Sequence, residues 1–209
     1  QAYSAAFKKT GIIRAGGVET LFNLAQAFST QPLPEGPGLV LVPNSGGPGI
    51  LAADACEKST LSMARLSLHT VDRLKAFLPA YASLYNPVDI IGDADAERYR
   101  KTLEAVLDDP NVHAVLVLLS PTSSAQIEET AQAIIDNAAT SSKPVFACFM
   151  GGVRVEPGRR MLLAAGIPCY AFPEPAIGSI EAMHGYNQWR KTPDPHFPAI
   201  FGDTEKAAA

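Results

Sequence analysis

The hydrophobic pattern alternates between short continuous apolar runs and longer segments with helical spacing. The apolar runs lie near residues 38–43, 61–66, 113–119, 144–149 and 168–172. Continuous apolar residues, rather than alternating ones, indicate strands that are covered on both faces, as in a parallel sheet. The other segments predict helices near residues 48–58, 70–78, 95–108, 123–139, 154–165 and 174–189. This alternation predicts an α/β fold with a five-stranded parallel sheet and helices on both faces.

The strand order decides where a site can lie. Right-handed crossovers with one reversal after the second strand give the flavodoxin-like order 2-1-3-4-5. In that order the first and third strands are neighbours, and their carboxyl ends open into one crevice. Because open α/β sheets bind ligands at such a switch point, we expect the site between the loops that follow residues 38–43 and 113–119.

A short helix, strand and helix pattern precedes the sheet domain. Residues 1–9 and 19–28 have helical spacing, and Ile12-Ile13-Arg14 predicts a short edge strand between them. Apolar residues along the second helix fall on one face, which we expect to be buried. They are Val18, Leu21, Phe22, Leu24, Ala25 and Phe28.

A proline-rich stretch at residues 29–37 is typical of a linker. It divides the chain into three predicted parts. Residues 1–34 are the end of a preceding domain with its linker, residues 35–190 are the flavodoxin-like domain, and residues 191–209 are a tail.

Composition and charge exclude several classes of function. The 209 residues are 47% hydrophobic and carry a formal net charge of -4, so we expect no binding to nucleic acid or to an anionic membrane. No apolar run approaches the ~20 residues of a membrane span, and no secretion signal is visible. Cys56, Cys148 and Cys169 are scattered, which predicts buried thiols in a reducing cytoplasm rather than a disulfide framework or a metal site.

The most informative loop follows the first strand. Asn44, Ser45, Gly46, Gly47 and Gly49 join that strand to an alanine-rich helix. Glycines leave backbone N–H groups uncovered at the positive end of the helix, where an anion such as phosphate or carboxylate is stabilised. The alternative is a tight turn that binds nothing.

The same loop matches a relaxed dinucleotide-binding fingerprint over Gly47 to Ala52. That fingerprint requires an acidic residue at the end of the next strand to bind the ribose. The segment from Ser67 to Thr70 contains none. Nicotinamide or flavin binding therefore rests on fold analogy alone.

Other candidate residues follow later strands. Thr122, Ser123 and Ser124 follow the third strand and should enter the same crevice as the glycine loop. Ser123 and Gln126 also have the spacing of a capping box, so a well-capped helix is the alternative.

Two further loops carry possible supporting residues. Asp89, in the motif NPVD, could orient a ligand or bond to its own backbone in a turn. Gly151 and Gly152 follow the fourth strand beside Arg154, whose charge could also belong to a solvated helix face.

No catalytic group stands out in the chain. A nucleophilic histidine needs an accessible loop, and none of the four has that setting. No two have metal-ligand spacing, and there is neither a G-x-S-x-G elbow nor a lysine-bearing P-loop. The histidines are His69, His113, His184 and His196.

Five longer motifs occur in order along the chain: VPNSGGPGILAADACE, LYNPVDIIGDADAERY, DDPNVHAVLVLLSP, KPVFACFMGG and AAGIPCYAFPEPAIGSIEAM. Together they resemble the ligase-type domains of nucleoside-diphosphate-forming acyl-CoA synthetases, relatives of acetate-CoA ligase and succinyl-CoA synthetase. The resemblance covers residues 39–189.

The resemblance implies a role for the chain in the interconversion of acyl-CoA, phosphate and ADP with free acid, CoA and ATP. The reaction runs through an acyl phosphate and a phosphohistidine, which we expect upstream of Gln1. Asn44 to Gly47 occupy the place of a substrate-contacting asparagine loop. Thr122 to Ser124 match the start of a phosphate-facing helix, with hydroxyl side chains where the family has glycines.

The same resemblance implies the partners. CoA, ATP or ADP and Mg²⁺ would be used through other domains, namely a CoA-binding domain and an ATP-grasp domain, and we expect no tightly bound cofactor here. A small anionic substrate and a possible homo-oligomer complete the expectation. The alternative function is a non-catalytic acyl-CoA sensing or scaffold domain of a larger fusion protein such as an acetyltransferase.

Overall fold

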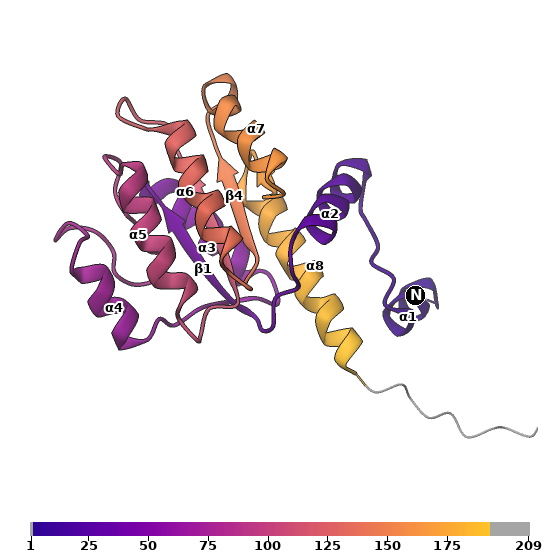
Figure 1. Ribbon diagram of the computed structural model, residues 1–209. Coiled ribbons are helices and arrows are strands. Elements are labelled where there is room, and N and C mark those ends of the chain that lie inside the picture. Colours follow the sequence, from indigo (N-terminus) through magenta and orange to yellow (C-terminus); the bar gives the residue numbers. More distant parts are fainter. Residues whose placement is uncertain (1, 193–209) are drawn as a thin grey trace, which may run out of the picture.

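The computed structural model describes residues 2–192, which form a five-stranded parallel sheet with helices on both faces (Figure 1). The strand order is β2-β1-β3-β4-β5, which confirms the predicted flavodoxin-like order 2-1-3-4-5. The strands are β1 (Gly38–Pro43), β2 (Ser62–Met63), β3 (Ala114–Leu119), β4 (Val145–Phe149) and β5 (Cys169–Tyr170).

The central strands are buried on both faces. In β1, Val40 and Val42 point into one core while Leu39 and Leu41 point into the other. All six residues of β1 and all six of β3 are buried. This is why their sequences are continuous apolar runs.

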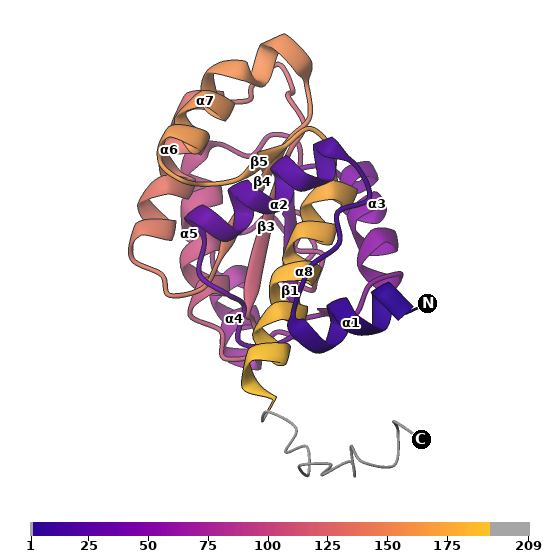
Figure 2. The same cartoon turned by 90° about the vertical axis from the view of Figure 1, so that its right-hand side faces the viewer.

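One face of the sheet is covered by α4 (Leu68–Lys75), α5 (Ala96–Leu107), α6 (Ile127–Ala139) and α7 (Glu156–Ala164). The other face carries α2 (Val18–Thr30), α3 (Gly46–Glu57) and α8 (Pro173–Lys191). Figure 2 shows α8 between α2 and α3, with α1 (Ala2–Thr10) beyond them. A short 3₁₀ helix, η1 (Gly152–Val155), connects β4 to α7.

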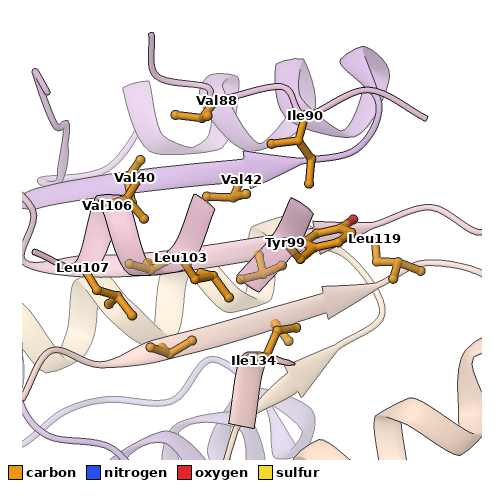
Figure 3. Packing of buried hydrophobic residues seen from close by; sticks show 14 of the residues in the cluster. Val40, Val42, Val88, Ile90, Tyr99, Leu103, Val106, Leu107, Leu119 and Ile134 are labelled. Atoms are coloured by element: carbon orange, nitrogen blue, oxygen red, sulfur yellow. The ribbon is translucent and has the colours of Figure 1, made fainter. Parts of the chain in front are cut away.

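Strand β2 is shorter than the predicted 61–66. It pairs with β1 only at Gly38 and Leu39. Beyond that point the NPVD segment takes its place: the Val88 N–H donates to Leu41 O at 2.9 Å and the Ile90 N–H donates to Pro43 O at 2.9 Å. Figure 3 shows the side chains of Val88 and Ile90 over β1, in the same core as Tyr99.

Asn86 is the residue that joins these pieces. Its Oδ1 accepts from the Leu41 N–H at 3.0 Å, and its Nδ2 donates to Leu39 O at 2.8 Å and to Ala64 O at 3.2 Å. The side chain thus replaces ladder hydrogen bonds between β1 and the strand beside it. The sequence shows the motif but not this role.

Two predictions for the N-terminal region are wrong. No strand forms at Ile12 to Arg14, where the Ile12 N–H instead bonds to Phe7 O at the end of α1. Helix α2 contributes Ala27 and Phe28 to the core, but Val18, Leu21 and Phe22 are 72%, 55% and 69% exposed. The N-terminal half of the apolar stripe that the pattern assigned to the core therefore faces outward.

The boundary at residue 34 stays a prediction. On the N-terminal side of it, Gln31 is already tied to the sheet domain, since its Oε1 accepts from the Val145 N–H at 2.9 Å. The predicted tail lies outside the described residues from residue 193 onward, and α8 continues through Lys191.

Candidate functional site

The glycine loop lies at the carboxyl end of β1 and opens α3. The helix begins at Gly46, with Ser45 as an N-cap residue whose side chain makes no capping hydrogen bond. The N–H groups of Gly46 and Gly47 have no acceptor within the helix because they belong to its first turn. Both residues are exposed, and Pro48 carries no N–H. Two backbone donors at the positive end of α3 therefore lie exposed at the carboxyl end of β1.

The loop glycines differ in what surrounds them. A Cβ on Gly47 would meet no atom within 4 Å, whereas a Cβ on Gly49 would lie 3.0 Å from Pro43 Cγ. The Gly49 N–H is already bonded to Ser45 O at 3.3 Å. Gly49 therefore permits close packing of the loop on β1, and Gly47 leaves the crevice open.

Asn44 is a buried bridge between the two strand ends. Only 2% of it is exposed. Its Nδ2 donates to Ser120 O at 2.9 Å, and its Oδ1 accepts from the Ser120 N–H at 2.8 Å. The amide thus fixes the loop after β1 to the loop after β3. A substrate contact by Asn44 stays a prediction, since both polar atoms of the side chain are engaged.

The turn from Thr122 to Ser124 lies beside the glycine loop, as β1 and β3 are adjacent. The Thr122 hydroxyl donates to Gly92 O at 2.9 Å and lies 3.3 Å from the Ser124 hydroxyl. A Cβ on Gly92 would lie 3.7 Å from Asn44 O. These contacts bring the two predicted loops together around Gly92.

The predicted helix start at Ser123 is wrong, because α6 begins at Ile127. The N-cap residue is Gln126, whose side chain makes no capping bond but accepts from the Ala96 N–H at 3.0 Å. The Thr122 hydroxyl bonds to the loop before α5, and the Gln126 side chain bonds to the first residue of α5, instead of to the helix they precede. Such competition is common for short polar residues.

Asp89 lies close to the start of α3. Its Oδ2 would be 3.7 Å from a Cβ on Gly46, and its Oδ1 accepts from the Ile91 N–H at 2.9 Å. The turn bond matches the simpler of the two interpretations, and the second oxygen faces the glycine loop. Ile91 has a φ of 70°, an unusual value for a β-branched residue.

Tyr99, on α5, supports the end of β3, and no motif in the sequence indicated this role. It is 1% exposed, and its hydroxyl donates to Leu118 O at 3.1 Å near the end of β3. Burial raises the pKa of Tyr99 well above its usual value, and the charge of Asp89 acts in the same direction. The phenol therefore stays neutral and remains a donor.

Gly151 and Gly152 flank the crevice on the β4 side. A Cβ on Gly151 would lie 2.5 Å from Pro121 Cγ, so only glycine fits there. Gly152 has a φ of +54°. From the same loop, the Arg154 guanidinium donates to Thr122 O. The Arg154 side chain is thus fixed beside the Thr122 turn and does not belong to a solvated helix face.

The crevice therefore combines two free backbone donors, hydroxyl groups, one guanidinium and one carboxylate. The donors and Arg154 favour an anion, and Asp89 offers an acceptor for an N–H or O–H group of a ligand. His113 is remote from it, because its Nδ1 accepts from Gly38 N–H at the opposite end of β1.

Within residues 2–192, no three ligating side chains of His, Cys, Asp or Glu gather closely enough to hold a metal ion. Nor is any helix in this part of the chain both long and apolar enough to cross a membrane.

Residues 39–192 match the family model described as the Ligase-CoA domain. The chain belongs to this family. The match begins with β1 and ends after α8, so it contains the crevice loops described above.

Two curated relatives of this Ligase-CoA domain are acetate-CoA ligases. One is acetate-CoA ligase [ADP-forming] I of Archaeoglobus fulgidus, 38% identical over 188 residues that cover 90% of this chain and 26% of the relative. Another is the alpha subunit of acetate-CoA ligase [ADP-forming] II of Pyrococcus furiosus, 38% identical over 87% of this chain and 40% of the subunit.

A solved structure is similar over the same range. It is the dinucleotide-forming acetyl-coenzyme A synthetase 1 of Ca. Korarchaeum cryptofilum in complex with phosphate and ADP. The TM-score is 0.84 at 32% identity, over 90% of this chain and 41% of that one. The present domain thus spans between 26% and 41% of the length of these three relatives.

Proposed function

We propose that this Ligase-CoA domain forms part of an ADP-forming acyl-CoA ligase and binds the phosphoryl group during catalysis. In the proposed sequence, phosphate displaces CoA from acyl-CoA to give an acyl phosphate. A histidine outside this chain then takes the phosphoryl group and releases the free acid. ADP finally accepts the phosphoryl group from that histidine to give ATP.

The single observation that supports this role best is the juxtaposition of the α3 start with the Thr122 to Ser124 turn. The Asn44 bridge and the Thr122 bond to Gly92 hold the two loops in one crevice. Preorganised backbone donors at a helix start stabilise charge that develops on a transferred phosphoryl group. Family membership and the acetate-CoA ligase relatives supply the chemistry.

The remaining parts of the reaction are assigned to other domains or subunits. A CoA-binding domain and an ATP-grasp domain would hold CoA, the nucleotide and Mg²⁺, and no step runs through a metal on this chain. The exposed stripe of Val18, Leu21 and Phe22 on α2 is suited to cover by such a neighbour. The P. furiosus relative is itself one subunit of an enzyme. We propose the cytoplasm as the compartment.

The test uses the full-length protein that contains this domain. It should carry radioactive phosphate from γ-labelled ATP on a histidine, in an acid-labile form, and should release that label on addition of an acid and CoA. An acid-stable label on serine, or no label at all, would contradict the proposal. Gly47→Val is the companion variant, as a side chain there meets no protein atom but covers the free donors.

A further inference from the structure

A cavity lies at the carboxyl edge of the sheet, on the β4 side of the predicted crevice. Its volume is about 550 Å³, and it is enclosed by the ends of β4 and β5, the η1 loop and helix α2. This falls within the range of about 300–1,000 Å³ that is typical of small-molecule sites. The phosphoryl group alone does not require a space of this size. We call it the β4–β5 cleft.

The lining of the β4–β5 cleft is mainly apolar and aromatic. The residues are Phe149, Met150, Val155, Tyr170, Phe172 and Pro175. Phe172 is 62% exposed although it is a large aromatic side chain. An aromatic surface that the protein itself leaves uncovered is suited to contact with an apolar ligand group.

The charges around the cleft disfavour a second anion. Glu156 and Arg159 form an ion pair with a separation of 3.5 Å, so their charges compensate each other. Glu19 from α2 adds a negative charge. Asn23 and Gln26 from the same helix supply neutral polar groups. The cleft is therefore suited to an uncharged group that is largely apolar.

The cleft and the crevice share one wall. Gly151 lines the cleft, and its Cα lies so near Pro121 that a Cβ would be 2.5 Å from the proline ring. Thr122, next to Pro121, receives the hydrogen bond from Arg154. Because an acyl phosphate joins its acyl carbon to phosphorus through one oxygen, a phosphate held in the crevice directs the acyl group toward an adjacent space.

We propose that the β4–β5 cleft binds the acyl group of the substrate and admits bulky or aromatic acids. The inference rests on the proposed function, because it places the acyl group relative to the phosphoryl group of that reaction. Ala171 and Phe172 then determine specificity: Ala171 is a small residue at the cleft wall, and Phe172 provides an aromatic surface.

The experiment measures acyl-CoA formation by the full-length ligase with acetate and with phenylacetate as probes. The readout is the ratio of kcat/KM for phenylacetate to that for acetate. Ala171→Phe fills the cleft and should lower this ratio about tenfold, the scale of discrimination by apolar pocket volume. Phe172→Ala removes the aromatic contact and should also lower the ratio. Because Phe172 is exposed, this variant removes no buried side chain.

Val153→Ala is the matched control. Val153 belongs to the same loop region but is 92% exposed and does not line the cleft, so the ratio should not change. A wild-type enzyme that uses acetate and rejects phenylacetate would overturn the inference, as would an unchanged ratio in both cleft variants. An enzyme that converts no acid at all would instead overturn the proposed function.

Discussion

Removal of the Asn44 amide tests whether this bridge holds the crevice together. Asn44→Ala deletes two hydrogen bonds to the backbone of Ser120, at 2.9 and 2.8 Å, in a position where Asn44 is 2% exposed. Each buried partner left unsatisfied costs about 1–3 kcal/mol. Because Ser120 is half-buried and can regain some water, we expect a total loss of about 2 kcal/mol in the free energy of unfolding.

Urea denaturation followed by circular dichroism measures this change directly. The midpoint should fall with the slope m unchanged, because the surface exposed on unfolding is the same. Phosphate affinity should fall as well, since the Thr122 turn is no longer tied to the glycine loop. Asn44→Asp keeps the size of the side chain but changes one hydrogen bond. One carboxylate oxygen can still accept from the Ser120 N–H, but the other then faces the Ser120 carbonyl oxygen.

The matched control is Asn111→Ala. This exposed side chain makes a single hydrogen bond, from its Nδ2 to Arg65 O at 2.9 Å, so the expected loss is below about 1 kcal/mol. An Asn44→Ala protein within about 0.5 kcal/mol of wild type, a change too small for two buried hydrogen bonds, would refute the assigned role of the bridge.

Four further substitutions test the fold. Asn86→Ala should cost about 2–4 kcal/mol in urea denaturation, because three hydrogen bonds to strand backbones are lost; a near-neutral result would contradict that role. Gly158→Ala should destabilise the protein by about 1–3 kcal/mol, since the added Cβ would lie 2.8 Å from Ile127 Cγ2. Gly178 lies on α8, and a Cβ there would meet no atom within 4 Å. Gly178→Ala should therefore stabilise the protein by about 0.5–1 kcal/mol. Equal effects of the two glycine variants would count against this packing. Burial and the charges of His113 and Lys191 lower the pKa of His184, although the charge of Glu181 acts in the opposite direction. The unfolded chain therefore binds a proton at this histidine more readily than the folded protein does. The free energy of unfolding should decline as pH falls below about 6.5, the usual pKa of histidine. His184→Gln should flatten that decline when the melting temperature is measured against pH. An unaltered dependence of the melting temperature on pH would show that His184 is not its cause.

The main features of the fold could be predicted because they depend on local pattern. The continuous apolar runs of β1 and β3 identify central strands, and the alternation with helices fixes the class. The length of β2 could not be predicted, since residues from Asn86 to Ile90 replace it in the sheet through contacts that are distant in sequence. Apolar spacing on α2 predicted a buried face, but spacing alone does not say what covers that face.

The adjacency of the loops at the candidate site was predictable, and their side-chain contacts were less so. The strand order alone brings the glycine loop and the Thr122 turn together, which the structure confirms. The engagement of both Asn44 side-chain atoms with Ser120 depends on a contact across 76 residues. Tyr99 supports the end of β3 from α5, which no local motif indicates. Arg154 was a candidate from the sequence, but its bond to Thr122 O depends on a contact across 32 residues.

The most direct test of the central claim is a titration of this chain with inorganic phosphate, followed by ¹H–¹⁵N NMR. The amide signals of Gly46 and Gly47 should shift and saturate together, whereas the amide of Gly178 on α8 should not move. Gly47→Val should abolish the saturable shift while the rest of the spectrum stays folded. Shifts confined to exposed arginines and lysines, with the two glycine amides unchanged, would contradict the account.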